Sequence, residues 1–128
     1  MATWDQEIID LAMQMPEIEL TTWGRKTGEP RCVIIWIWGD GERLFIRSGR
    51  GLGRDWPQNL QARNEAILHL AGRDIPVRAR HVTDPAEARA CSHMVVAKYA
   101  QTASPVGTSP ELTPGETATF ELLPNPAS

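Results

Sequence analysis

The chain has few cysteines, no long apolar run and no internal repeat, and each absence excludes a class of protein. Only Cys32 and Cys91 occur in 128 residues, without metal-ligand spacing, so we expect two buried, reduced thiols. No apolar run approaches the roughly 20 residues that a membrane-spanning helix needs. The first residues lack a basic stretch followed by an apolar one, so we expect no signal peptide and a cytoplasmic protein.

Positive charge is concentrated in one segment of an otherwise acidic chain. The net charge of −3 argues against a general nucleic-acid-binding protein. Residues 22–54 nevertheless hold seven Arg or Lys side chains against three acidic ones, a segment charge of +4. A positive patch on an acidic protein fits a specific anionic ligand better than a polyanion. Two of these arginines, Arg43 and Arg47, are expected to lie on solvated strand faces or to pair with acids.

Apolar periodicity and turn residues predict one α+β domain over residues 1–128. We expect an amphipathic helix within residues 1–16, a helix over 55–64 with Asp55 as N-cap, and a helix from the cap Thr83-Asp84-Pro85 to about Tyr99. Residues 102–116 are rich in Pro, Ser, Thr and Gly and predict an exposed loop or lid. Six strands, joined by antiparallel hairpins, are expected at residues 17–23, 32–38, 43–47, 66–70, 75–82 and 117–123. This order predicts a small barrel and disfavours a Rossmann domain.

Two short turns combine glycine with arginine or lysine, and each follows a strand-like run. They are Gly24-Arg25-Lys26-Thr27-Gly28-Glu29-Pro30-Arg31 and Ser48-Gly49-Arg50-Gly51-Leu52-Gly53-Arg54. Glycine allows positive φ and a close approach of ligand to backbone, while Arg and Lys supply donors suited to phosphate or carboxylate. Neither turn is a GxGxxG or Walker motif. Together they predict a site for a large anionic small molecule such as a phosphorylated cofactor.

Other chemistry is not expected from this sequence. His69, His81 and His93 lie twelve residues apart, a spacing that matches no common zinc motif, so we expect no metal site. No Gly-x-Ser-x-Gly elbow is present, which disfavours a hydrolase.

Aromatic residues near the two turns are candidate ligand contacts. Trp36 and Trp38 are expected in the core or at a dimer interface, whereas Trp56 lies where it could pack against a flat heteroaromatic ring. Tyr99 precedes the 102–116 loop, and its hydroxyl could donate a proton to substrate. A half-buried packing role for Tyr99 stays open beside that catalytic one.

The two turns and the helix after them resemble a known family. The segments that carry the resemblance are residues 22–31, Ser48-Gly49-Arg50-Gly51 and Trp56-Pro57-Gln58-Asn59-Leu60-Gln61-Ala62. In this order they are similar to the deazaflavin-dependent nitroreductase family. Arg50 departs from that family's usual turn, and residues after Thr102 lack the clustered tyrosines of some members.

The resemblance implies a six-stranded split β-barrel, related to pyridoxamine-phosphate-oxidase-like flavin proteins and typically homodimeric. It also implies binding of the deazaflavin coenzyme F420, which carries a phosphodiester and a polyglutamate tail. Arg25, Lys26 and Arg31 would hold the phosphate or tail carboxylates, assisted by backbone N–H groups of the first turn. The full implied cofactor set is Gly24, Arg25, Lys26, Thr27, Gly28, Arg31, Ser48, Gly49, Arg50, Gly51, Trp56 and Asn59.

The implied reaction is hydride transfer from reduced F420 to a hydrophobic, electron-poor acceptor: a nitroarene, quinone or enone. Tyr99 is the candidate proton donor in this reaction. Two alternatives stay open. One is the same fold with FMN as cofactor, and the other is a non-catalytic carrier of a cofactor or lipophile.

Overall fold

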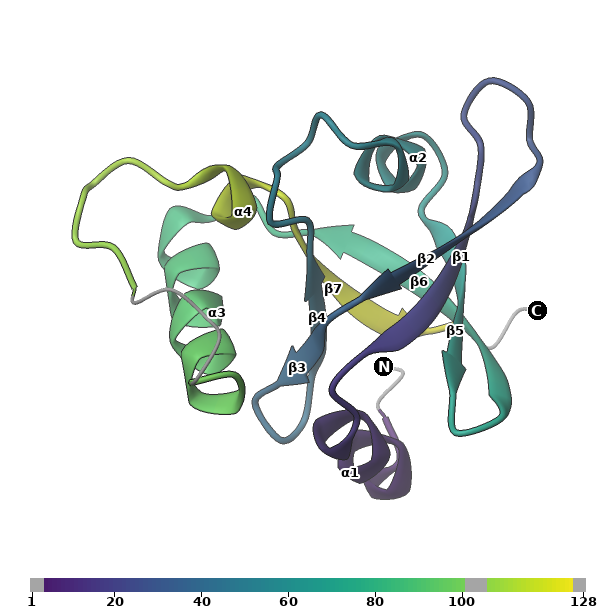
Figure 1. Cartoon of the computed structure of the whole chain (residues 1–128), viewed down its shortest axis with the longest axis horizontal. Helices are drawn as coiled ribbons and strands as arrows, with labels where there is room; N and C mark the ends of the chain where they lie inside the picture. The colour runs from purple at the N-terminus through teal and green to yellow at the C-terminus, as the bar shows by residue number, and fades with distance from the viewer. Residues whose placement is uncertain (1–3, 101–105, 126–128) are drawn as a thin grey trace.

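A computed structural model describes residues 4–100 and 106–125 (Figure 1). Its described part contains one antiparallel sheet of seven strands in the order β2-β1-β5-β6-β7-β4-β3, with four helices around it. The strands are β1 Ile18–Trp23, β2 Pro30–Ile35, β3 Ile37–Gly39, β4 Leu44–Arg47, β5 Glu65–Leu70, β6 Arg73–His81 and β7 Thr119–Pro124. The helices are α1 Gln6–Gln14, α2 Asp55–Ala62, α3 Pro85–Lys98 and α4 Pro114–Thr117.

The sheet is rolled, and the connection at Trp36 shows why. Strands β2 and β3 are the two edges of the sheet, yet one residue, Trp36, joins them. In a flat sheet of seven strands the edges would lie roughly 29 Å apart, at about 4.8 Å per strand. One residue spans only about 7 Å between its neighbours, so the sheet curls until its edges meet. The predicted single strand 32–38 is therefore two strands, and the predicted count of six is one too low.

Apolar residues fill the inside of the roll and one outer layer. Inward-facing Leu20, Leu68 and Leu122 are fully buried in the main core. Helix α1 closes one end of the roll with Ile9 and Ala12 (Figure 1). Helix α3 packs outside β3 and β4 over a second cluster: Trp38, Phe45, Val82, Ala88 and Cys91. None of the described helices is long and apolar enough to cross a membrane.

Two details of the sequence analysis are wrong. Cys32 was expected to be buried, but it lies on the outward face of the edge strand β2 and is exposed, while Cys91 is buried as expected. Helix α2 begins with Asp55, and its N-cap is Arg54, so Asp55 is one residue inside the helix and makes no capping hydrogen bond. Asp84 does cap α3, since its side chain accepts from the N–H of Ala86.

The described part of the predicted 102–116 loop is ordered by a short helix. Thr113 and Glu116 form a capping box, in which each side chain accepts the other residue's backbone N–H, at the start of α4. Residues 102–105 of that loop lie outside the described residues. The segment after them runs back over α3 to reach β7 (Figure 1).

Candidate active site

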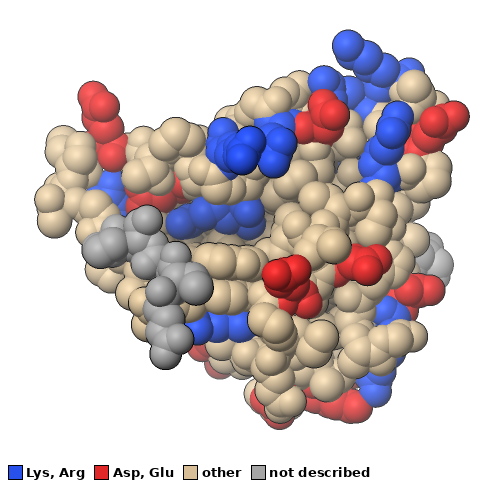
Figure 2. All heavy atoms as spheres, viewed as in Figure 1, with Lys and Arg blue, Asp and Glu red and all other residues tan. Residues whose placement is uncertain are grey.

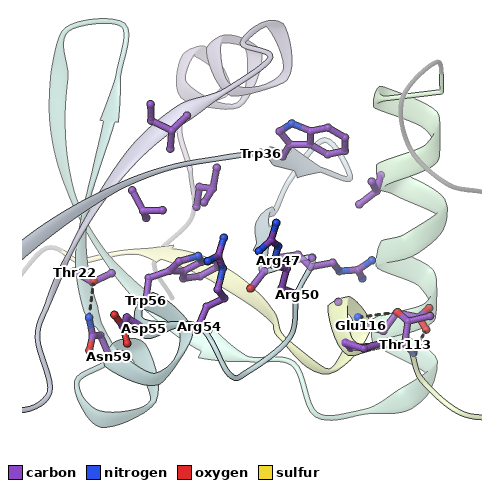
Figure 3. A pocket seen from close by; sticks show the side chains of 18 of the residues that line it. Thr22, Trp36, Arg47, Arg50, Arg54, Asp55, Trp56, Asn59, Thr113 and Glu116 are labelled. Atoms are coloured by element: carbon purple, nitrogen blue, oxygen red, sulfur yellow. Dashed lines mark hydrogen bonds between the residues drawn. The ribbon is translucent and has the colours of Figure 1, made fainter.

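A cavity of about 1180 Å³ lies between α2, the two glycine turns and the α3–α4 side of the molecule (Figure 3). Its wall includes most of the residues predicted from the turns. These are Gly24, Arg25, Lys26, Thr27, Arg31, Ser48, Gly49, Arg50, Trp56 and Asn59. Gly28, Gly51 and Tyr99 are the predicted site residues that do not line it. The structure thus brings together segments far apart in sequence around one space.

Asn59 fastens the first turn to the barrel. Its side chain is 2% exposed, and its Oδ1 accepts the backbone N–H of Arg25 at 3.0 Å. Its Nδ2 donates to the hydroxyl of Thr22 at 3.3 Å, inside the sheet. A buried amide that is satisfied on both sides fixes the position of the backbone that it binds. Asn59 therefore positions the first turn as well as lining the cavity.

Most backbone N–H groups of the first turn already donate hydrogen bonds to other atoms of the protein. The Gly24 N–H donates to the Glu29 carbonyl at 2.8 Å, and the Gly28 N–H donates to the Gly24 carbonyl at 2.7 Å. Gly28 has φ +72°, so it shapes the turn without lining the cavity. With the Arg25 N–H bound to Asn59, the N–H groups of Lys26 and Thr27 are the ones left for a ligand among residues 24–28.

The second turn packs against α4. Gly51 has φ +88°, and a Cβ there would lie 3.1 Å from Cβ of Pro114. Glycine at this position thus allows α4 to approach the turn and does not serve the ligand directly. Ser48 is buried, while Gly49 and Arg50 are exposed at the cavity.

Cations dominate the cavity wall. Six Arg or Lys residues line it against two carboxylates, Asp55 and Glu116. Figure 2 shows Lys and Arg atoms gathered around the hollowed upper part of this face. Asp55 lies 3.5 Å from Arg25 and is almost fully exposed, so this pair leaves most of the positive charge unbalanced. The cations are Arg25, Lys26, Arg31, Arg47, Arg50 and Arg54.

Arg47 enters the wall from β4, contrary to its expected position on a solvated strand face. Its guanidinium donates to the Thr119 hydroxyl at 2.7 Å, the Ser92 hydroxyl at 2.9 Å and the Ala88 carbonyl at 3.1 Å. It also lies over the Trp38 ring, 5.3 Å from the centroid. Burial lowers the pKa of Arg47 from its usual value, the largest effect on it. Arg43, by contrast, pairs with Asp40 and Glu87 as expected.

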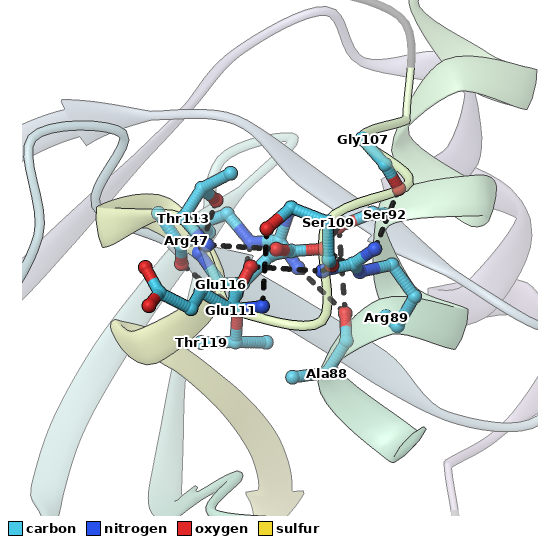
Figure 4. Close-up of polar contacts among 11 residues, drawn as sticks. Arg47, Ala88, Arg89, Ser92, Gly107, Ser109, Glu111, Thr113, Glu116 and Thr119 are labelled. Atoms are coloured by element: carbon cyan, nitrogen blue, oxygen red, sulfur yellow. Dashed lines mark hydrogen bonds and ion pairs between the residues drawn. The ribbon is translucent and has the colours of Figure 1, made fainter. Parts of the chain in front are cut away.

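Glu116 joins α4 to α3 (Figure 4). Its carboxylate accepts from the Ser92 hydroxyl at 2.7 Å and from the Thr113 N–H at 2.9 Å. Arg89 lies 2.7 Å from the same carboxylate as an ion pair. Although burial alone would raise it, these donors lower the pKa of Glu116 from its usual value, so the buried side chain is ionised.

Arg89 also holds the segment that precedes α4. Its guanidinium donates to the backbone carbonyls of Gly107, Ser109 and Glu111 (Figure 4). Gly107 and Thr113 line the cavity at the two ends of this segment. One arginine on α3 therefore determines where this part of the cavity wall lies.

Tyr99 lies behind the wall. Its hydroxyl donates to the carbonyls of Pro16 and Ile37 at 2.8 and 3.2 Å, and its ring stacks on Trp36 at 4.0 Å. Trp36, not Tyr99, lines the cavity. Burial raises the pKa of Tyr99 from its usual value. These contacts support the packing alternative, and proton donation by Tyr99 stays a prediction.

Several cavity residues were not predicted from the sequence. The α3 residues Ser92, Val95 and Val96 carry no motif and are brought to the cavity by the packing of α3 on β3 and β4. Arg47 and Trp36 were noted but expected elsewhere. Within the described residues no group of three or more His, Cys, Asp or Glu side chains could hold a metal ion.

Several solved structures share this fold. The chain is similar to an F420-H2-dependent reductase named FDR-A, with 20% identity, 84% of this chain and 93% of that chain covered, and a TM-score of 0.64. It is similar to a domain-swapped dimer, with 20% identity, 84% and 79% covered, and a TM-score of 0.61. It is also similar to a Listeria innocua protein named for pyridoxamine 5′-phosphate oxidase, with 12% identity, 95% and 92% covered, and a TM-score of 0.64.

The rolled antiparallel sheet places the chain among the split-barrel proteins. The chain belongs to the F420H(2)-dependent quinone reductase family, whose family model matches residues 4–113. The resemblance seen in the two turns is thereby confirmed at the level of F420-dependent reductases. The match ends at Thr113, so it includes both turns and α3 but not α4.

Proposed function

We propose that this chain binds coenzyme F420 in the cavity and transfers hydride to an electron-poor acceptor: a quinone, an enone or a nitroarene. The observation that carries the proposal is the arrangement of charge in one continuous cavity. Exposed cations of the first turn lie at one end, and apolar and aromatic side chains of β2, β3 and α3 lie at the other. The charged tail of the cofactor needs the first end, and a hydrophobic acceptor that meets the cofactor's ring needs the second.

The residues present fit such a cofactor. Lys26 and Arg31 are exposed at the cavity and would bind the phosphodiester or tail carboxylates. Arg50 and Arg54 add positive charge nearer the middle, beside Trp56 (Figure 3). A volume of about 1180 Å³ exceeds the usual upper size of a small-molecule pocket, about 1000 Å³, so the cavity is large enough for a cofactor of this kind.

When bound, F420 supplies the hydride, and the protein contributes position and environment. Trp36, Val95 and Val96 form an apolar wall that excludes water from the reacting groups. Asn59 and Arg89 hold the two ends of the wall in place, so the bound molecules meet in a fixed geometry. The chain's own residues thus bind, orient and desolvate.

Turnover tests this proposal directly. Reduced F420 is mixed with the protein and with a quinone, a nitroarene or an enone, and loss of reduced cofactor is followed by absorbance. We expect oxidation of the cofactor to depend on both the protein and the acceptor. Binding of F420 without turnover of any acceptor would support the carrier alternative, and turnover with reduced FMN in place of F420 would support the flavin alternative.

We also infer that the chain forms a homodimer. The outer face of the edge strand β2 carries Ile34, whose side chain is 62% exposed, and an edge strand offers unpaired backbone groups to a partner. Light scattering coupled to size exclusion tests this inference. A mass near 28 kDa, twice the 14.2 kDa of the chain, is expected, and a monomer at micromolar concentration would refute it.

A further inference from the structure

The α3–α4 end of the cavity has features that the cofactor does not explain. It is the end opposite the exposed cations of the first turn, and it is lined by Trp36, Trp38, Val95 and Val96 together with Arg47 and Ser92. A site with an apolar wall and one buried cation selects a ligand that is mostly apolar and carries one negative charge.

The charge at this end is unbalanced. Arg47 and Arg89 are both cationic, and Glu116 is the carboxylate that lies between them. Cys91 also lies near Arg47, but burial raises the pKa of its thiol to about 11, so it is neutral at physiological pH. One net positive charge therefore remains on these partly buried groups. An uncompensated buried charge is unfavourable until an anion arrives.

Unused donors are present in the same wall. Three hydrogen bonds to protein atoms engage three of the five N–H donors of Arg47, which leaves two without a partner among the described residues. Trp38 is 1% exposed, and its indole N–H is buried without a hydrogen-bond partner within residues 4–100 and 106–125. That nitrogen has no exposed surface, so the two free N–H groups of Arg47, which lines the cavity, are the donors available to a ligand.

The Arg47 side chain in this wall is also held in position before a ligand binds. Ser92 and Thr119 hold the guanidinium of Arg47, and Glu116 holds Ser92. A series of polar contacts, Arg47–Ser92–Glu116–Arg89, leads from the cavity to the surface of α3 (Figure 4). A cation held by three protein contacts loses little freedom when it binds an anion, which strengthens the site.

We propose that this end is the binding subsite of the electron acceptor, and that the acceptor is a flat aromatic carbonyl compound bearing an anionic oxygen group. The anionic group binds Arg47, and the ring lies against Trp36, Val95 and Val96. That the ligand here is an electron acceptor rests on the proposed function. The preference for an anion rests on the cavity alone.

The test uses cofactor-free protein and two probes with the same ring system. These are 1,4-naphthoquinone-2-sulfonate, which is anionic, and 2-methyl-1,4-naphthoquinone, which is neutral, and binding is followed by quenching of tryptophan fluorescence. We expect wild-type protein to bind the sulfonate at least about tenfold more tightly. Equal affinity for the two probes would overturn the proposal.

Three variants locate the anion. Arg47→Met is expected to remove most of the preference, and Val95→Glu, on the half-buried face of α3, is expected to reverse it by placing a carboxylate in the wall. Val95→Glu leaves the Arg47 contacts in place, so it decides the question if Arg47→Met fails to fold. Lys26→Met, at the other end, is expected to keep the preference. Loss of the preference in Lys26→Met, with retention in Val95→Glu, would place the anion at the first turn and overturn the subsite.

The anion preference is measured without F420, so its result is distinct from a test of the proposed function. If the protein binds no F420 but shows the preference, with its loss in Arg47→Met or its reversal in Val95→Glu, the anion subsite stands and the proposed function fails. If the protein binds and uses F420 but shows no preference, the proposed function stands and the subsite is refuted.

Discussion

The side-chain oxygen of Asn59 accepts the backbone N–H of Arg25 at 3.0 Å, across 34 residues of sequence. The contact joins the start of the first glycine turn to the middle of α2. Because the same amide donates to Thr22 at the end of β1, the turn has one position relative to the barrel. The site therefore depends on a buried amide as well as on the cations that face the ligand.

Replacement of this amide tests its role. Asn59→Ala leaves the Arg25 N–H and the buried Thr22 hydroxyl without their partner, and we expect the free energy of unfolding to fall by about 2 kcal/mol. F420 affinity should fall too, because the turn is no longer fixed. Urea unfolding and cofactor titration measure the two effects. Gln61→Ala, on the exposed face of the same helix, is the matched control and should change neither.

The exposed cations of the first turn should serve the ligand and not the fold. For Lys26→Ala combined with Arg31→Ala, we expect F420 affinity to fall by at least about tenfold and the melting temperature of the cofactor-free protein to change little. Wild-type affinity should weaken in high salt, since the contacts are exposed. Arg78→Ala, which removes one exposed arginine outside the cavity, is the control. Unfolding of the cofactor-free double variant would mean that the two cations are structural.

Arg89 should control the wall formed by residues 107–116. Arg89→Met removes donors to three carbonyls and the partner of Glu116, so this segment should lose protection from hydrogen exchange. We expect KM for the acceptor to rise several-fold while F420 affinity is unchanged, because the first turn lies at the other end. An equal loss of F420 affinity would contradict a role confined to this end. Arg73→Met, on β6 outside the cavity, is the control for the loss of an arginine side chain.

Acid should weaken the ion pairs between α3 and the sheet. A hydrogen bond from Arg80 holds the pKa of Glu87 below its usual value of 4.5. The unfolded chain then binds more protons than the folded one near this pH, so the contribution of Glu87 is complete above pH 4.5 and is lost as pH falls through the folded pKa. The stability difference between wild type and Glu87→Gln should therefore shrink as pH falls from about 7 to about 3, measured by urea unfolding. A difference that is constant over this range would contradict the account.

Substitution of Tyr99 distinguishes a packing role from proton donation. Tyr99→Phe removes the hydroxyl that donates to Pro16 and Ile37 but keeps the ring on Trp36, so we expect a loss of about 1 kcal/mol in stability and near wild-type turnover. Stopped-flow measurement of cofactor oxidation provides the rate. A fall of about 100-fold or more with unchanged stability would instead identify Tyr99 as the proton donor.

Local sequence signals predicted most of the helices and strands and the turns at one end of the cavity. The hairpin between the predicted strands 32–38 and 43–47, the Asp84 cap and the two turns are each encoded by adjacent residues, and the structure contains them. The break at Trp36 could not be predicted in this way. It follows from the pairing of β2 with β1 and of β3 with β4, on opposite edges of the sheet.

The α3–α4 end of the cavity was missed for the same reason. Ser92 and Val95 look like ordinary helix residues, and Arg47 looks like a solvated strand residue, until α3 packs on β3 and β4. These residues become part of a site through tertiary packing, which no local sequence pattern indicates. Cys32 was misplaced because an apolar run at a sheet edge reads like one in the middle of a sheet.

Titration of the cofactor-free protein with F420 and with FMN, followed by fluorescence, tests the central claim most directly. The account predicts tight, salt-sensitive binding of F420 and weaker binding of FMN, because several exposed cations favour a long charged tail over a single phosphate. It also predicts that Lys26→Ala with Arg31→Ala reduces this difference. Equal affinity for the two cofactors, or no binding of either, would contradict it.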